Sequence, residues 1–519
     1  MSIASARAVR RGAADASSSD RSSVRNLIDS PGWRFGVVSV LGFVPVLLET
    51  VRGTNEIFDF WEHAATVHQL MLHTTNPGNA LLAIHTPSAF FSPYALLVAL
   101  GAKLTGAGPV HALAAAGLVN YWLLIAGLWW FTRVFSDRRQ APFYTLLFVW
   151  LLWGVNPWKY SGFFHLRALS AVIAYPSTFA TALGMLTAAL WHSNQSRRGR
   201  AQWLAVALTA VGLAVVVLTH PIAGTATAAA LVAISLTTAG RGRSLVLLIA
   251  VAAGAGLLCL AWPYYPVLHL LSNEDVYDPS NATMYSSWIE RIFPVLAALC
   301  LFFYDTGTLR RARLGIYCAV LLVVFVYGDL SRHYSDGRVI SYIVIGAQIG
   351  LADLAAALER PALERLRGRW LVVVAGAIAV LAIAEVYNMR GGFRGSLPGT
   401  GAEPTVYGAY RAAVSGLPPD ATVLTPLNQG LEATIPVYAG RLVATHRPLA
   451  FVSDQGERQQ AVSAFFSAQA NDGYRREMIA RYDVRYIVVP ASPPASVAQV
   501  EQLGSVIRRG TAFDTIAVK

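Results

Sequence analysis

Apolar segments of about 20 residues recur along most of this 519-residue chain. A helix of that length crosses the hydrocarbon core of a bilayer, which is about 30 Å thick. Hydrophobic residues make up 55% of the chain and charged residues only 13%, whereas soluble domains carry about 25% charge. The pattern predicts a polytopic α-helical membrane protein. Its net charge of +12 is then explained by arginines between the spans, and it gives no indication of nucleic-acid binding.

The hydropathy pattern predicts about 11 membrane helices, at residues 34–52, 109–134, 141–157, 171–192, 202–219, 221–240, 244–270, 288–304, 314–330, 339–357 and 370–387. The segments between them alternate in basic content. One set of five holds 14 Lys or Arg in 39 residues, and the opposite set of four holds five in 96. The positive-inside rule places the first set and the N-terminus in the cytoplasm, so we expect a multi-pass protein of the plasma (inner) membrane.

The longest connection in the membrane part, residues 53–108, is external in this topology. The alternation is consistent only if the apolar stretch 87–105, which Pro93 interrupts, lies at the outer surface. The alternative is that this stretch crosses the membrane, which would place Arg138 and Arg139 outside. In the expected topology ten of the 11 histidines lie at or beyond the outer surface, which predicts a polar cavity that opens outward.

Composition also predicts the domain organisation. Residues 1–32 are rich in Arg and Ser and are expected to form a disordered cytoplasmic tail. Residues 33–387 form the transmembrane module, and a Gly/Pro-rich linker leads into an external α/β domain at 388–519. Within that domain we expect strands at 421–424, 486–489 and 513–518 and a helix at 463–482. The domain is expected either to cover the site and help bind the acceptor, or only to stabilise the protein.

Three ionisable residues stand at the start of the long external loop. Asp59, Glu62 and His63 are spaced i, i+3 and i+4, so on a helix they share one face. Such a trio suits a general base with an orienting partner, or the ligand set of a divalent metal ion. The alternative is a capped surface helix in which Asp59 caps and Trp61 anchors at the lipid interface.

A second cluster lies in the short external loop 331–338. There Arg332 and Arg338 flank His333 and Tyr334, in a loop too short to need such charge for solubility. The planar fork of arginine donates two parallel hydrogen bonds to a phosphate. The loop therefore predicts a phosphate site, with lipid-headgroup anchoring by both arginines as the alternative.

Aromatic and cationic side chains are interleaved in a third cluster, after the third predicted span. It consists of Trp158, Lys159, Tyr160, His165 and Arg167. Aromatic faces beside cations suit sugar rings and isoprenoid chains. They suit an interfacial aromatic belt without a specific ligand equally well.

The order of these parts resembles the polyprenyl-phosphate-sugar-dependent glycosyltransferases of the GT-C superfamily, with bacterial members in particular. The resemblance lies in one span followed by the acidic motif 58–63, in a loop that continues through 85–87 to 104–106, and in segments 435–441 and 482–489. It covers most of residues 34–519. The Trp-Trp-Asp-type and Asp-x-Asp motifs of oligosaccharyl- and protein-O-mannosyl-transferases are not found, which argues against a required metal; a divalent metal at Asp59, Glu62 and His63 stays an alternative.

The resemblance implies transfer of a sugar from a polyprenyl-phosphate carrier to a glycan, glycolipid or protein acceptor on the external face. Asp59 matches the first-loop carboxylate and is implied as the general base for the acceptor hydroxyl. From the residues themselves we expect Glu62 and His333 to assist in proton transfer. Donor phosphate is expected at Arg332, Arg338, Lys159 and Arg167. Substrate contacts are expected from His63, His85, Trp61, Trp158, Tyr160, His165 and Tyr334.

Two other function classes fit parts of the sequence. A membrane transporter or lipid flippase also places ionisable groups in a helical bundle, although these spans hold few charges and show no internal repeat. A transferase similar to O-antigen ligases or polymerases would use the external Arg/His loop without Asp59. Loss of sugar transfer on mutation of Asp59 separates the first reading from both.

Overall fold

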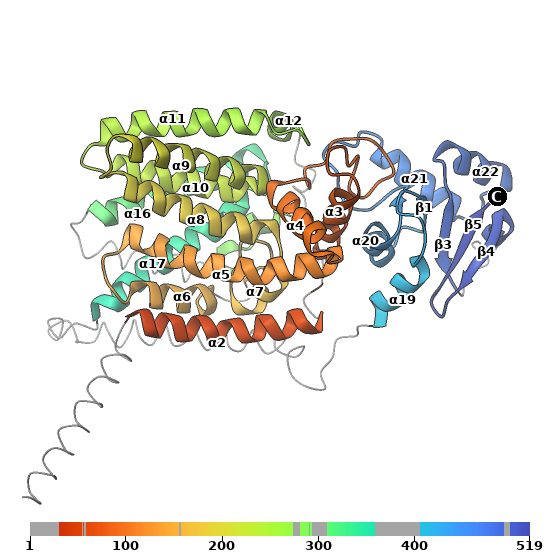
Figure 1. The fold of residues 1–519 in the computed structure, drawn as a ribbon, viewed down its shortest axis with the longest axis horizontal. Coiled ribbons are helices and arrows are strands. Elements are labelled where there is room, and N and C mark those ends of the chain that lie inside the picture. The colour runs from red at the N-terminus through yellow and green to blue at the C-terminus, as the bar shows by residue number, and fades with distance from the viewer. Residues whose placement is uncertain are drawn as a thin grey trace, which may run out of the picture.

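The computed structural model describes residues 31–53, 56, 59–154, 157–272, 281–289, 291–292, 309–358, 405–491 and 499–519. A bundle of long helices occupies one end of the molecule and a smaller region with a β-sheet the other (Figure 1). Several predictions lie outside the described residues: the span at 370–387, most of the span at 288–304, nearly all of the tail at 1–32, and the boundary at residue 388.

The bundle is built from apolar helices that run side by side (Figure 1). Within the described ranges, six helices are long and apolar enough to cross a membrane. They are α2 (Pro31–Arg52), α5 (Pro109–Phe135), α9 (Arg200–Thr219), α11 (Arg241–Leu260), α16 (Leu309–Ser331) and α17 (Ile340–Leu358), the last preceded by the 3₁₀ helix η1 (Tyr334–Val339). Among them lie α6 (Ala141–Leu151), α8 (Pro176–Asn194) and α10 (Pro221–Leu236). The chain is thus an integral membrane protein by its helices, and the total of about 11 spans stays a prediction.

Proline interrupts two of the predicted spans. The helix expected at 171–192 is divided into α7 (Leu166–Val172) and α8, because Pro176 lacks an N–H and favours an extended residue before it. Tyr175 has that extended conformation, with φ −76° and ψ 149°. Likewise the span expected at 244–270 ends at Leu260, and the short α12 (Val267–Ser272) follows after Pro263 and Pro266. The prediction of continuous helices was wrong at both places.

A glycine turn ends α6 earlier than expected. The helix stops at Leu151 instead of reaching residue 157. Gly154 follows with φ +106°, and a Cβ there would collide with the backbone carbonyl of Arg291. Only glycine fits this close approach, so the chain turns here towards the aromatic loop that contains Trp158.

Two short helices of the long loop, α3 (Phe60–Leu72) and α4 (Pro93–Thr105), lie between the bundle and the C-terminal end of the molecule (Figure 1). Ser92 caps α4, accepting a hydrogen bond from the Ala95 N–H at 3.3 Å. The 13 residues of α4 span roughly 20 Å at 1.5 Å per residue, which is too short for a hydrocarbon core of about 30 Å. This length supports a surface helix at 87–105.

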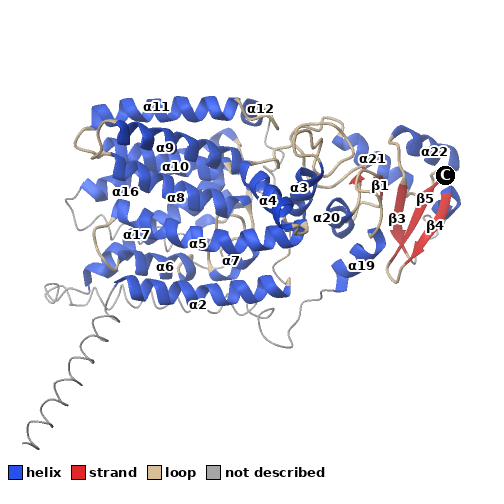
Figure 2. Ribbon diagram, in the orientation of Figure 1, coloured by secondary structure: helices blue, strands red, loops and turns tan. Residues whose placement is uncertain are grey.

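Residues 405–519, here called the C-terminal region, form a mixed sheet with helices around it (Figure 2). The strand order is β2-β1-β3-β5-β4, with β1 parallel to β2 and β3, and β5 antiparallel to β3 and β4. The strands are β1 (Thr422–Leu424), β2 (Arg441–Leu442), β3 (Tyr486–Pro490), β4 (Gly504–Arg509) and β5 (Phe513–Val518). The three expected strands are therefore present, as β1, β3 and β5.

The helices of the C-terminal region are α19 (Thr405–Val414), α20 (Gln429–Tyr438), α21 (Gln455–Phe465) and α22 (Asp472–Arg481). The prediction of a single helix at 463–482 was wrong, because α21 ends at Phe465 and α22 begins at Asp472. Asn471 starts a new helix because its side chain accepts the Tyr474 N–H at 2.8 Å, which is the role of an N-cap.

The sheet is connected to the membrane part through its β2 edge. Leu82 of the long loop pairs with Leu442. The Leu442 N–H donates to the Leu81 carbonyl at 2.8 Å, and the Ala83 N–H donates to the Leu442 carbonyl at 2.9 Å. An exposed sheet edge is a site for unwanted pairing. Here the long loop covers it and joins the two parts of the molecule.

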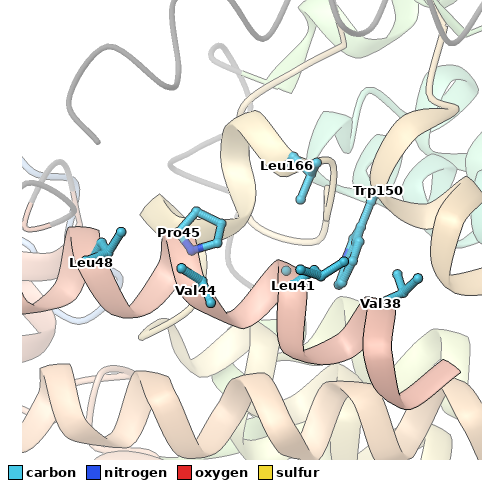
Figure 3. Close-up of a pocket in the computed structure, with 8 residues that line it drawn as sticks. Val38, Leu41, Val44, Pro45, Leu48, Trp150 and Leu166 are labelled. Carbon is cyan, nitrogen blue, oxygen red and sulfur yellow. The ribbon is translucent and has the colours of Figure 1, made fainter. Parts of the chain in front are cut away.

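An apolar groove opens on the side of the bundle along α2 (Figure 3). Its cavity volume is about 390 Å³, and it lies between α2, Trp150 and Leu166. The Trp150 ring packs on Gly42, where a Cβ would collide with it. The groove is lined by apolar residues, as expected for the flank of a membrane bundle that faces lipid tails.

Candidate active site

The carboxylates at the start of α3 meet an arginine from the C-terminal region. Asp59 occupies the N-cap position of α3, yet its side chain makes no capping bond. Its Oδ1 instead accepts a hydrogen bond from Nη2 of Arg447, and the same nitrogen lies 2.7 Å from Oε2 of Glu62. The Asp59 side chain is 42% exposed and that of Glu62 is 14% exposed. Asp59 is thus both paired and open to a substrate.

Glu432 holds the backbone and side chains around Arg447. This buried carboxylate, on α20, accepts from the Thr445 hydroxyl at 2.8 Å and from the His446 N–H at 2.7 Å. Its other oxygen lies 2.8 Å from Nδ1 of His446. A buried carboxylate that accepts several hydrogen bonds is a rigid anchor. The loop that presents Arg447 is therefore fixed by the C-terminal region itself.

His63 points from α3 towards the bundle. Its ring lies 5.3 Å from that of Tyr175 and 6.0 Å from that of Phe90, centroid to centroid. Tyr175 is also hydrogen-bonded to the backbone of Asp59. Burial lowers the pKa of His63 to about 4, so the imidazole is neutral at physiological pH. The break before Pro176 is what lets Tyr175 reach the start of α3.

Arg338 approaches the same place from η1. Its guanidinium donates to the hydroxyl of Ser161, and one Nη2 contact to the Ser161 carbonyl measures 3.5 Å. The pKa of His220 lies well below its usual range. Burial is the largest cause, and the nearby Arg338 and His63 add to it. His220 lies in the turn between α9 and α10 and accepts the Ala223 N–H at 3.2 Å. The second and third sequence clusters thus meet at Arg338 and Ser161.

The two arginines of the 331–338 loop differ in environment. Arg338 is half-buried, whereas Arg332 is exposed and has φ +63°, a left-handed conformation that is rare for a non-glycine residue. His333 is also exposed, with its ring 6.3 Å from that of Tyr327. Tyr334 packs at 5.6 Å from Tyr285. Of Arg332, His333, Tyr334 and Arg338, only Arg338 lies near His220, whose pKa it affects together with His63.

The aromatic cluster after α6 is mostly packed inside. Trp158 is 5% exposed and its carbonyl lies 3.0 Å from Nε2 of His165, which is 1% exposed. Tyr160 is exposed at 38%, and Lys159 is exposed as well. Arg167 lies on α7. Tyr160 and Lys159 are therefore accessible to a ligand in this structure, whereas Trp158 and His165 are internal.

Trp61 and His85 lie on the side that faces the C-terminal region. Trp61 is 2% exposed, donates from Nε1 to the Glu56 carbonyl at 2.8 Å, and has its ring 6.2 Å from that of Tyr438. It therefore does not lie at a lipid interface. His85 is exposed and borders Gly78, next to Arg441.

The expected metal trio is arranged differently. Asp59 and Glu62 both face Arg447, while the His63 ring packs on Tyr175. Across the described ranges, no group of three His, Cys, Asp or Glu side chains is placed to hold a metal ion. A guanidinium between two carboxylates takes the place that a cation would occupy, so these three residues do not fit a metal centre in this arrangement.

Burial raises the pKa of Glu62 above its ordinary value, and Asp59 and Glu432 add to the rise while Arg447 opposes it. Two carboxylates that share one site generally hold one proton between them. Glu62 therefore holds its proton to a higher pH than an ordinary glutamic acid does, and Asp59 is the more exposed carboxylate of the two.

The sequence analysis missed Arg447, Glu432 and Tyr175, whereas it counted His220 among the ten histidines expected at the outer surface. Arg447 lies 388 residues from Asp59 along the chain. Its segment, Thr445-His446-Arg447-Pro448, has polar and cationic character but no spacing that connects it with the first loop. The helix break before Pro176 was the one local signal for Tyr175.

No protein-family model matches this sequence, and no curated protein is similar to it in sequence. Solved structures are similar in fold. ArnT from Cupriavidus metallidurans bound to undecaprenyl phosphate has a TM-score of 0.55 at 15% identity, over 94% of this chain and 98% of that one. The Archaeoglobus fulgidus oligosaccharyltransferase in complex with Zn and sulfate has a TM-score of 0.51 at 13% identity, over 88% of this chain and 68% of that one.

A second structure from Archaeoglobus fulgidus, the oligosaccharyltransferase AglB with an inhibitory peptide and a dolichol-phosphate, gives the same TM-score of 0.51. Its identity is 12%, over 91% of this chain and 70% of that one. At such identities the similarity establishes a shared fold, and it extends over almost the whole length of the chain.

Proposed function

We propose that this chain, which has the fold of the GT-C membrane glycosyltransferases, transfers a sugar from a polyprenyl-phosphate carrier to an acceptor hydroxyl. One observation carries the proposal. A partly exposed carboxylate, Asp59, lies with His63 and Tyr175 at the end of the membrane bundle that faces the C-terminal region, and the cation Arg338 lies beyond them, near His220. A lipid-linked sugar needs its tail in the bilayer and its reacting carbon at the surface, and this is where these groups meet.

In the proposed reaction Asp59 acts as the general base. A sugar or protein hydroxyl is a weak nucleophile until its proton is removed. The acceptor oxygen forms a bond to the anomeric carbon as the bond from that carbon to the phosphate oxygen breaks. The acceptor proton goes to the Asp59 carboxylate, and the electron pair leaves with the polyprenyl phosphate. Glu62, which shares Arg447 with Asp59, takes part as the second member of the carboxylate pair.

Arg338 is proposed to hold the donor phosphate. It is half-buried, lies directly before α17, and is near enough to His220 to affect the pKa of that side chain. A helix N-terminus adds a favourable dipole for an anion. Arg332, His333 and Lys159 are exposed, and Lys159 lies two residues before Ser161 in the chain. We therefore assign the phosphate to Arg338, with Tyr160 and Lys159 as outer contacts for the sugar.

The chain is proposed to lie in the plasma membrane with residues 53–108 and 388–519 external. Ion pairs at the other end of the bundle support this orientation. Arg138 pairs with Asp353 at 3.4 Å, Arg310 pairs with Asp137, and the buried Arg313 donates to the Val134 carbonyl at 2.6 Å. Cations at that end fit the positive-inside rule. The acceptor is proposed to be a glycan, glycolipid or protein at the external face.

The test is transfer by membranes of cells that express the full chain, supplied with synthetic polyprenyl-phosphate sugars, one hexose series and one pentose series. Label that passes from donor to acceptor supports a transferase. Asp59→Asn should reduce transfer at least 1,000-fold, on the order expected when a general base is lost together with the charge balance of its site. Asp483→Asn, an exposed carboxylate far from α3 in the sequence, is the matched control and should retain activity.

Near-normal turnover in Asp59→Asn would remove Asp59 from the mechanism. Movement of the intact lipid-linked sugar across the membrane, without transfer, would favour the flippase alternative.

A further inference from the structure

We infer that Arg447 is a positioning residue for the proposed transfer and that the C-terminal region is therefore part of the active site. Arg447 orients Asp59 and places a positive charge against the two carboxylates at the start of α3. This rests on the proposed function, in which the Asp59 carboxylate receives the acceptor proton. It assigns to the C-terminal region a chemical role beyond covering or stabilising the membrane part.

The first support is that α3 and the C-terminal region are docked at several points. His68 Nδ1 lies 2.9 Å from the Pro436 carbonyl, and His73 Nε2 lies 3.0 Å from Asp420 Oδ1. The Trp61 ring packs against Tyr438. With the strand-like pairing of the long loop to β2, these contacts fix α3 along its length. Arg447 thus reaches the carboxylates from a rigid neighbour.

The second support is the way the Arg447 backbone is held. Nε2 of Gln455 donates to the Arg447 carbonyl at 2.5 Å, and Oε1 of the same amide accepts the Leu449 N–H at 2.9 Å. Gln459 donates to the Thr445 carbonyl at 2.7 Å, on the other side of Arg447. Together with Glu432, these amides fix the loop before and after the arginine. A merely solvated surface arginine does not need such an arrangement.

The third support is the charge balance. Three titratable groups of the membrane part face Asp59: Glu62 and His63 on α3, and Tyr175 at the start of α8. The C-terminal region contributes Arg447, with Glu432 behind it. Arg338 and His220 lie beyond His63. His63 is neutral, and Glu432 is engaged with His446. Arg447 is therefore the cation in direct contact with both acids. Without it, the two acids, one helical turn apart, would bind their shared proton more tightly.

The expected consequence is a shift in pH dependence. In Arg447→Met the acidic limb of the profile for kcat should move up by about one pH unit or more, because the carboxylate pair binds a proton more tightly without its counter-charge. Transfer at pH 6 should fall more than 10-fold, and transfer at pH 8.5 should return to within about threefold of wild type. A purely structural role would reduce activity equally at all pH values.

Two further variants sharpen the test. One nitrogen of Arg447 makes both contacts, so Arg447→Lys should keep most activity if its single ammonium reaches the pair. Arg485→Met is the matched control: this arginine pairs with Asp483 within the C-terminal region and should leave the profile unchanged. An unshifted profile in Arg447→Met, or equal losses at pH 6 and pH 8.5, would overturn the inference.

A readout without sugar transfer separates this inference from the proposed function. Dicyclohexylcarbodiimide labels protonated carboxyl groups in apolar surroundings. The full chain in nanodiscs is labelled at a series of pH values, and the extent of labelling is measured by mass spectrometry of the peptide that contains α3. The pH of half-maximal labelling should rise by about one unit in Arg447→Met, and much less when Glu62→Gln is added, because one carboxylate then has no acidic neighbour. A shift in labelling without sugar transfer by the wild type would refute the proposed function and leave only the electrostatic effect of Arg447 on the carboxylates supported. Sugar transfer without a shift in labelling would support the proposed function and overturn the role inferred for Arg447.

Discussion

Replacement of Arg338 by Ala should weaken binding of a polyprenyl phosphate. The guanidinium is half-buried near His220, so a phosphate beside it is screened less than at an exposed site. A pair of unit charges about 4 Å apart at an effective dielectric constant of about 20 interacts by roughly 4 kcal/mol. Desolvation removes part of this, which leaves about 1.5–3 kcal/mol, the range for a charge-assisted hydrogen bond. Affinity should therefore fall roughly 10- to 150-fold.

The assay is titration of the full chain in nanodiscs with undecaprenyl phosphate, followed by native mass spectrometry. Arg338→Lys should recover only part of the affinity, because the forked geometry is lost. Ser161→Ala tests whether the loss comes from the broken contact between Arg338 and Ser161 and not from the charge; it should bind within about threefold of wild type. Arg332→Ala is the matched control, since its side chain is exposed in the same loop. An unchanged dissociation constant in Arg338→Ala would refute the assignment and direct attention to Lys159 and Arg167.

Two other predictions concern stability and topology. Lowering the pH from 7 to 5 should destabilise the wild type relative to His63→Gln by about 2 kcal/mol, measured as the difference in denaturant midpoint in detergent. Burial lowers the pKa of His63 in the folded state to about 4, whereas its pKa in the unfolded chain is near 6.5. As the pH falls, the unfolded chain therefore binds the proton first, and the free energy of unfolding decreases between pH 6.5 and 4. An equal pH dependence in both proteins would contradict this environment for His63. In a variant without its native cysteines, single cysteines at the exposed positions Ala89 and Arg485 should both react with an impermeant thiol reagent in intact cells. Reaction at one position only would show that the helix count between them is wrong by an odd number.

The class of the protein follows from the sequence because it depends on local properties. The length and polarity of apolar runs predict membrane helices without knowledge of their neighbours. The expected spans correspond to α2, α5, α9, α16 and α17 to within a few residues at each end. Prolines or a glycine interrupt the expected spans 141–157, 171–192 and 244–270, and the effect of proline was readable in principle at Pro176 and at Pro263.

The candidate base was also within reach of the sequence. Asp59, Glu62 and His63 have helical spacing at the end of a span, and the structure places them on the first turn of α3. Their environment was not predictable in the same way. The helical spacing was consistent with a metal trio, yet His63 turns to Tyr175 while both carboxylates turn to Arg447. Which way each side chain faces depends on what packs around the helix.

Only the tertiary structure determined which residues come together in the candidate active site. Arg332 and Arg338 have equal chemistry in the sequence, and their separation into an exposed and a half-buried residue comes from the path of η1. Arg447 joins Asp59 across 388 residues because the long loop pairs with β2 and α3 docks on α20. Hydropathy and helical period act over a few turns of chain. Electrostatic contacts act over a few ångströms of space, and only the folded arrangement determines which charges come that close.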